Sequence, residues 1–93
     1  MSSQEAKDIR EIVNITNKSG QNLQICIEPW GDELAFPAES HFRIEADGPG
    51  GQGLEIEIAT AHIVICGWVG SRLTVFDGAT VVRDYPIRVP PVP

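Results

Sequence analysis

The chain has 93 residues, of which 42% are hydrophobic and 22% charged, and a formal net charge of −6. This length suits one domain, the composition is that of a globular rather than a disordered protein, and the acidic balance disfavours nucleic-acid binding. No signal peptide or membrane-spanning run is recognisable and only two cysteines occur, so we expect a cytoplasmic protein with reduced thiols and no membrane partner.

The first part of the chain contains two clear strand signals. The polar residues 1–10 precede them and are expected to form a flexible N-terminal segment. From Glu11 onward the pattern has a period of two, which predicts a strand over 11–16. The clearest half-buried strand is 23–28, and it ends at Pro29, which has no N–H group to donate to a ladder.

The second part of the chain continues the same pattern. Apolar and polar residues alternate over 42–47 and 54–58, which are separated by the glycine-rich loop 48–53. Residues 62–66 are apolar on both faces, which predicts a central, well-covered strand. The pair Asp77–Gly78 is a strong turn signal and predicts a final hairpin.

Together these signals predict an all-β protein. About seven strands, with an edge strand at 34–36, would form a single domain over residues 11–85. We expect a small antiparallel β-sandwich, immunoglobulin-like or related, with a small barrel as the alternative. Residues 86–93 are rich in proline and are expected to form an extended tail outside the sheet.

Cysteine and histidine are the residue types most able to bind a metal or act as a nucleophile. His62 and Cys66 share one face of a strand but lie about 13 Å apart at about 3.3 Å per residue. That separation is too large for both to bind one zinc ion. Cys66, at the end of an apolar run, is typical of a buried thiol. Neither these residues nor Cys26 and His41 form a recognisable metal or catalytic site, so we predict no enzyme and no cofactor.

Four carboxylates alternate with apolar residues on two predicted strands. If 42–47 and 54–58 pair, Glu45, Asp47, Glu55 and Glu57 would crowd one solvent-facing surface. Such a surface could bind a cation weakly or meet a basic partner. The interpretation that we favour is a solvated face that discourages edge pairing and aggregation.

The two tryptophans each follow a strand, in the corners Glu-Pro-Trp-Gly-Asp and Gly-Trp-Val-Gly-Ser. The interpretation that we favour is that Trp30 and Trp68 plug the open end of the sandwich. The alternative is a shallow aromatic rim bordered by Asp32, Glu33, Ser71 and Arg72. Tryptophan and arginine are preferred interface anchors, so this rim could bind a saccharide, a cation, a peptide or a second subunit.

The two interpretations of the tryptophans predict different results for a truncated ring. In a rim, Trp68→Ala would weaken assembly or ligand capture more than fold stability, whereas in a plug it would unfold the protein. If both rings lie at one end, Glu28 or Asp32 could accept an indole N–H bond. On this reasoning the leading function is a binding or assembly module, with a homo-oligomer as one form, and the alternative is a small-ligand binder.

Four segments of the chain together resemble a family of small, functionally uncharacterised bacterial proteins: Leu23–Asp32, Pro37–Glu39, Gly67–Ser71 and Val75–Gly78. The family pattern has an E-P-W-G corner, a later G-W-x-G-S corner and a V-F-D-G hairpin. The resemblance covers about residues 12–80 and implies a compact all-β domain without a known activity. The tail from Tyr85 onward has no counterpart in that pattern.

Overall fold

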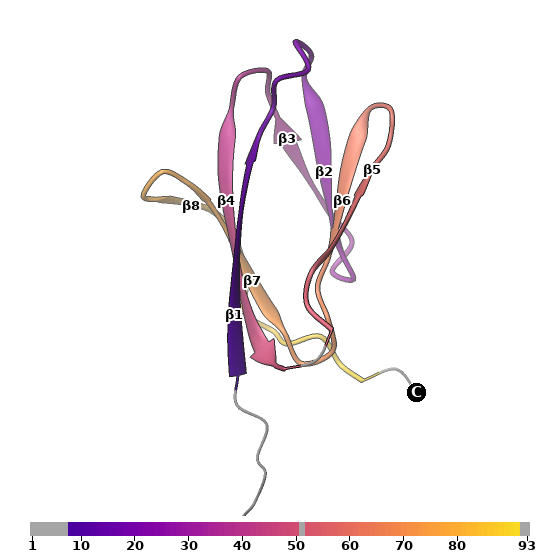
Figure 1. The fold of residues 1–93 in the computed structure, drawn as a ribbon, viewed down its shortest axis with the longest axis vertical. Coiled ribbons are helices and arrows are strands. Elements are labelled where there is room, and N and C mark those ends of the chain that lie inside the picture. Colours follow the sequence, from indigo (N-terminus) through magenta and orange to yellow (C-terminus); the bar gives the residue numbers. More distant parts are fainter. Residues whose placement is uncertain (1–7, 51, 92–93) are drawn as a thin grey trace, which may run out of the picture.

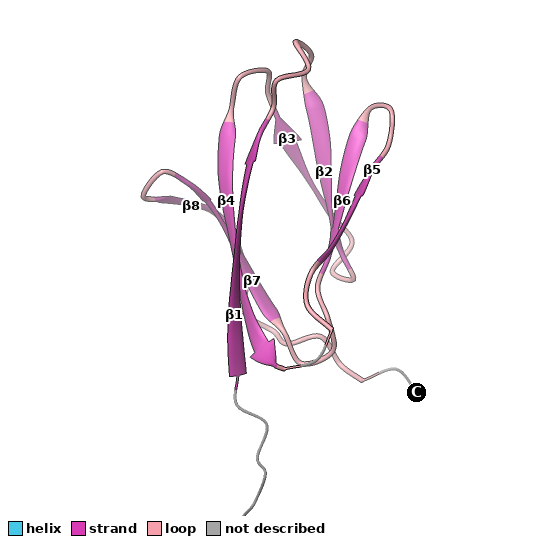
Figure 2. Cartoon of the chain, in the orientation of Figure 1, coloured by secondary structure: helices cyan, strands magenta, loops and turns pink. Residues whose placement is uncertain are grey.

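The computed structural model describes residues 8–50 and 52–91, which form eight strands in two sheets (Figures 1 and 2). The all-β prediction is confirmed, and the two separate sheets rule out the barrel alternative. Within the described ranges, no helix is long and apolar enough to cross a membrane. The strands are β1 (Asp8–Thr16), β2 (Leu23–Glu28), β3 (Asp32–Phe36), β4 (His41–Pro49), β5 (Glu55–Ile58), β6 (His62–Cys66), β7 (Arg72–Asp77) and β8 (Thr80–Tyr85).

Each sheet contains four strands. Sheet A has the order β1-β4-β7-β8, and sheet B has the order β3-β2-β6-β5. The hairpins β2–β3, β5–β6 and β7–β8 are antiparallel, as short turns require. The pairing of β2 with β6 is parallel, because these strands are joined through a long excursion of the chain that includes β4 in the other sheet.

The inner faces of the two sheets share one hydrophobic core. The alternation predicted for β2 and β4 is confirmed, since Ile25, Ile27 and Ile44 are fully buried. Val75 of β7 and Ile65 of β6 are also fully buried and belong to the same core. Because each sheet contributes alternate residues to this core, the other residues of the inner strands form two outer faces.

Strand β1 begins at Asp8, ahead of the predicted start at Glu11. The strand is longer because it pairs with β4 along its whole length, with Asp8 opposite Pro49 and Thr16 opposite His41. The N-terminal segment predicted to be flexible lies mostly in residues 1–7, which are outside the described residues.

Strand β4 likewise continues into the segment that was expected to be a loop. Gly48 is part of the strand, and a Cβ atom on it would lie only 2.7 Å from the Cα of Ser71. Real Cβ atoms do not approach a backbone atom so closely, so only glycine lets β4 pass this near the turn between β6 and β7.

The prediction that four carboxylates could share one face is wrong. Strand β4 belongs to sheet A, whereas β5 belongs to sheet B and pairs with β6. The glycine-rich segment after β4 therefore carries the chain between sheets instead of closing a hairpin. Glu45 and Asp47 lie on the outer face of sheet A, where each pairs with an arginine, while Glu55 and Glu57 lie on sheet B.

Strand β5 differs from its predicted half-buried pattern. Ile56 and Ile58 lie opposite the buried Ile65 and Ile63 of β6, so they occupy the core-facing side of sheet B. Nevertheless, Ile56 is 40% exposed and Ile58 is 82% exposed. Edge position alone does not explain this exposure, because Leu34 and Phe36 on β3, the other edge strand of sheet B, are buried. The isoleucines of β5 differ because they lie outside the core cluster that includes these two β3 residues.

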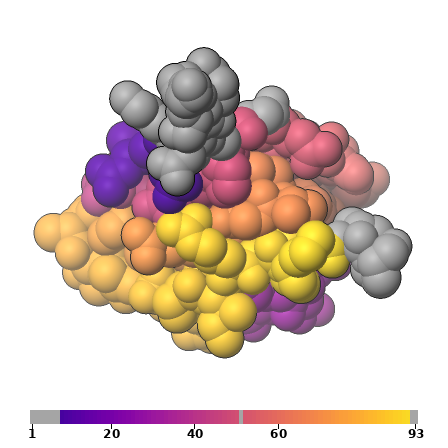
Figure 3. Space-filling model, turned by 90° about the horizontal axis from the view of Figure 1, so that it is seen from below, coloured from indigo at the N-terminus to yellow at the C-terminus, as the bar shows by residue number. Residues whose placement is uncertain are grey.

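The described part of the tail, residues 86–91, lies outside both sheets and crosses one end of the sandwich (Figure 3, yellow). We call this segment the strap. Val89 of the strap is buried, and its backbone is bonded to the β6–β7 turn. The Gly70 N–H donates to the Val89 carbonyl at 2.8 Å, and the Val89 N–H donates to the Ser71 carbonyl at 2.9 Å. The strap therefore closes this end of the domain.

Candidate functional site

Both tryptophan corners lie at the end of the sandwich that the strap crosses. They meet because β2 and β6 run parallel, so that Glu28 and Cys66 end their strands side by side. The Gly67 N–H donates to the Glu28 carbonyl at 2.8 Å, which ties the two corners together. A Cβ atom on Gly67 would lie 3.0 Å from Cη2 of Trp30, so the glycine makes room for this ring.

Trp68 is a core residue. Its side chain is 4% exposed, and its indole N–H donates to the Pro49 carbonyl at 2.7 Å. Its backbone N–H donates to Oγ of Ser71 at 3.0 Å, and Ser71 is fully buried. Two of the residues proposed for an exposed rim therefore face the interior, where they hold the end of β4 against the β6–β7 turn.

Trp30 is half-buried and holds the strap. Its indole N–H donates to the Ile87 carbonyl at 3.0 Å, and its ring lies 5.2 Å from the Tyr85 ring, centroid to centroid. Beside it is a groove of about 360 Å³, lined mainly by apolar residues. The lining residues are Pro29, Trp30, Ile87, Arg88, Val89, Pro90 and Pro91.

The expectation that Glu28 or Asp32 accepts an indole N–H bond is wrong. Both indoles donate to backbone carbonyls instead, because the strap and the end of β4 lie against the two rings. The Asp32 carboxylate accepts hydrogen bonds from the Tyr85 hydroxyl at 2.7 Å and from Nε of Arg83 at 3.2 Å. Asp32 on β3 thus joins the edge of sheet B to β8 of sheet A. The hydrogen bond from Tyr85 lowers the pKa of the Asp32 carboxylate.

Tyr85 is the only tyrosine of the chain, so its ionisation can be followed by ultraviolet absorbance. Burial raises the pKa of Tyr85 above its ordinary value of 10.0, and the hydrogen bond to the Asp32 carboxylate raises it further. We expect the folded protein to show little tyrosinate absorbance at pH 10, where the urea-unfolded chain is half ionised. Because the folded pKa is the higher one, the associated stability is present below pH 10 and is lost as the pH rises further.

The Asp32→Asn variant is the matched control for this titration. It removes the negative charge that opposes ionisation, so we expect the pKa of Tyr85 to move down toward its ordinary value. A folded wild-type protein that titrates with a midpoint at pH 10 would contradict the Tyr85–Asp32 contact.

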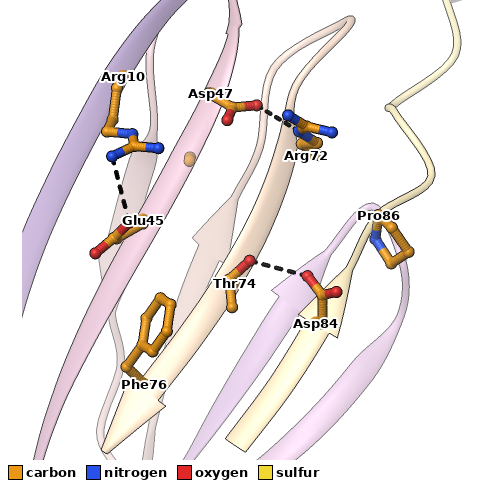
Figure 4. Close-up of a pocket in the computed structure, with 9 residues that line it drawn as sticks. Arg10, Glu45, Asp47, Arg72, Thr74, Phe76, Asp84 and Pro86 are labelled. Atoms are coloured by element: carbon orange, nitrogen blue, oxygen red, sulfur yellow. Dashed lines mark hydrogen bonds and ion pairs between the residues drawn. The ribbon is translucent and has the colours of Figure 1, made fainter. Parts of the chain in front are cut away.

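Arg72 lies on the outer face of sheet A, where its side chain points toward Asp47 (Figure 4). Its Nε donates to Asp47 at 2.7 Å, and it lines a hollow of about 330 Å³ on that face instead of the Trp30 groove. Arg10 and Glu45 pair across the same hollow at 3.9 Å. The residues predicted to form one rim are therefore divided among four places. Trp68 and Ser71 are buried, Trp30 lines the groove, Asp32 joins β3 to β8, and Arg72 lies on a separate polar face.

The two cysteines are free and lie on the outer face of sheet B. Burial raises the pKa of the Cys66 thiol, and the carboxylates of Glu55, Glu28 and Glu57 raise it further. The thiolate required of a nucleophile is thus disfavoured at this position. In the described parts of the chain, no three histidine, cysteine or acidic residues are grouped so that they could hold a metal ion.

The open edge of β5 is a site that sequence reasoning missed. The Ala59 N–H donates to the His62 carbonyl at 2.9 Å, which sets the hydrogen-bond alternation along the β5–β6 hairpin. By this alternation Glu57 bonds to β6, whereas Ile56 and Ile58 direct their N–H and C=O groups away from it. The same two isoleucines thus present exposed side chains and backbone groups that can accept a further strand. The local pattern of β5 carries no signal of its edge position, which depends on sheet order.

Scans against protein-family models, curated proteins and solved structures found no match. The resemblance to a family of small bacterial proteins therefore stays a prediction. Two features of the geometry bear on function, namely the open edge of β5 and the groove beside Trp30.

Proposed function

We propose that this protein is a non-enzymatic binding module that accepts an extended segment of a partner protein along the open edge of β5. The observation that carries the proposal is the 82% exposure of Ile58, beside Ile56, on an edge strand. Addition of a strand to an open sheet edge is a recurrent mode of peptide recognition. Backbone hydrogen bonds supply affinity in this mode, and alternate side chains supply specificity.

Other features of the molecule support binding in preference to catalysis. The hollow on sheet A contains compensated ion pairs, and the Cys66 thiol has a raised pKa. The two free cysteines support a reducing, cytoplasmic compartment as the place where the module acts.

The proposal can be tested with a fluorescein-labelled hexapeptide in which valine and threonine alternate. We expect fluorescence anisotropy to show saturable binding, and the Ile58→Lys variant to bind at least about tenfold more weakly because it places a charge on the apolar side. The matched control is Val69→Lys, at an exposed position in the β6–β7 turn. Both sites are exposed, so far-ultraviolet circular dichroism should show folded variants. Absent binding, or equal binding to wild type and Ile58→Lys, would contradict the proposal.

A second candidate function is capture of a small ligand, such as a saccharide, in the groove beside Trp30. The groove is favoured by its apolar lining and by the half-exposed indole, whereas its one charged lining residue, Arg88, opposes a cation. In a saccharide screen, this function requires quenching of tryptophan emission that the Trp30→Phe variant abolishes. A quench that persists in Trp30→Phe, or no quench at all, would speak against it.

A further inference from the structure

We propose that the segment bound at β5 carries basic residues in alternation with apolar residues, and that it belongs to a different protein and not to a second copy of this chain. This inference rests on the function proposed above and specifies the chemistry of the partner. It is carried by the charges that surround the open edge and by the register that a ninth strand would adopt.

The outer face of sheet B is acidic from one edge to the other. Glu55 lies beside Cys66, which in turn lies beside Glu28, so these side chains form one row across β5, β6 and β2. A second row runs from Glu57 through Val64 and Cys26 to Glu33 of β3. We call the surface formed by Glu28, Glu33, Glu55 and Glu57 the acidic face.

No lysine or arginine of the described residues lies on the acidic face. Three arginines lie on the outer face of sheet A and pair with carboxylates of that same face. They are Arg10, Arg43 and Arg72. The other described lysine and arginines belong to the β1–β2 loop, to β8 and to the strap, and are Lys18, Arg83 and Arg88. The negative charge of the acidic face is therefore uncompensated from within the described chain and is available to a cationic partner.

The register of an added strand determines where its side chains fall. Because the outward backbone groups belong to Ile56 and Ile58, the partner's backbone bonds form opposite these two residues. Its side chains at those positions lie on the core-facing side, against the exposed isoleucines. The intervening side chains fall opposite Glu55 and Glu57 on the acidic face. Opposite charges across a strand pair are favourable. A segment in which apolar and basic residues alternate would therefore place its apolar side chains against the isoleucines and its basic side chains against Glu55 and Glu57.

Pairing of β5 with the β5 strand of a second copy places like charges opposite each other. Antiparallel pairing of two β5 strands that keeps the core-facing sides together and overlaps at least three residues of each strand places Ile56 opposite either Ile56 or Ile58 of the other copy. The first register places Glu55 opposite Glu57, and the second places Glu57 opposite Glu57. Like charges directly opposite each other are destabilising, and each copy carries a net charge of −6. The acidic residues of β5 thus oppose self-pairing while they favour a basic partner.

The test uses three labelled hexapeptides that share valine at alternate positions and carry lysine, threonine or glutamate between them. We expect the lysine peptide to bind at least about tenfold more tightly than the threonine peptide, and the glutamate peptide most weakly. The double variant Glu55→Gln/Glu57→Gln should lose most of the lysine preference and keep its affinity for the threonine peptide. The control double variant Glu39→Gln/Asp77→Asn removes two exposed carboxylates elsewhere and should retain the preference.

The outcomes separate this inference from the proposed function. Equal binding of the lysine and threonine peptides, both weakened by Ile58→Lys, would overturn the basic partner and leave strand addition standing. Failure of every peptide to bind would overturn both. Sedimentation velocity is expected to show a wild-type monomer. A dimer that Ile58→Lys dissociates would overturn the choice of a different protein and identify a second copy as the occupant.

Discussion

Replacing Trp68 by alanine is expected to lower the free energy of unfolding by about 3–5 kcal/mol, as the truncation of large buried aromatic residues does. The side chain is 4% exposed, so its removal leaves a cavity at the end of the core. It also leaves the Pro49 carbonyl without its 2.7 Å indole donor. Since small domains have about 5–15 kcal/mol of stability in total, this single change removes a large part of it.

Urea unfolding followed by far-ultraviolet circular dichroism measures this loss directly. Trp30→Ala is the matched control, because that ring is only half-buried, and a smaller decrease is expected. A Trp68→Ala variant that unfolds at the wild-type urea concentration would refute the core placement. The same variant decides between the two interpretations of the corner, because only a rim residue could be truncated without loss of the fold.

The second large effect is expected at Asn17, which is 2% exposed and lies directly after β1. Its Nδ2 donates to the carbonyls of Gln21 at 2.7 Å and Phe36 at 2.8 Å, and its Oδ1 accepts from the Ser19 N–H at 3.0 Å. Asn17→Ala leaves these buried and half-buried groups without partners. Buried polar groups left unpaired are costly, so we expect a loss of about 2–3 kcal/mol.

For a domain of this size, such a loss corresponds to a decrease in Tm of roughly 8–24 °C. Asn14→Ala provides the control, because Asn14 is exposed on β1 and its truncation should change stability by about 0.5 kcal/mol or less. A second variant, Asn17→Asp, keeps the acceptor for Ser19 but turns a carboxylate oxygen toward two carbonyls. It should therefore be destabilised at neutral pH, and equal Tm values for all three variants would contradict the role of Asn17.

The two residues whose replacement is expected to lower stability most differ in how clearly the sequence pattern identifies them. Trp68 stands out as a large ring in a glycine-rich corner, and its burial was the favoured interpretation. Asn17 is one of several turn-forming residues between two strands, and nothing in that pattern separates it from its neighbours. Its importance arises because the β1–β2 loop meets the end of β3, with Phe36 as the contact, and this contact joins the two sheets.

Local sequence patterns are sufficient to place the strands and turns and to assign the inward-facing side of β2 and β4. These properties depend on alternation between residues two apart, on proline and on turn-forming pairs such as Asp77–Gly78, so they can be read locally. The expected positions of the strands accordingly match the structure closely, with the largest differences at β1 and at the end of β4.

Local patterns do not show which strands become neighbours and which remain at an edge. The parallel pairing of β2 with β6, the separation of β4 from β5 and the position of the strap all depend on contacts between distant segments. Ile44 and Ile58 look alike in their local patterns, yet one is fully buried and the other is 82% exposed. The difference arises because Ile44 lies on an inner strand and belongs to the core shared by the two sheets, whereas Ile58 lies on an edge strand beyond that core.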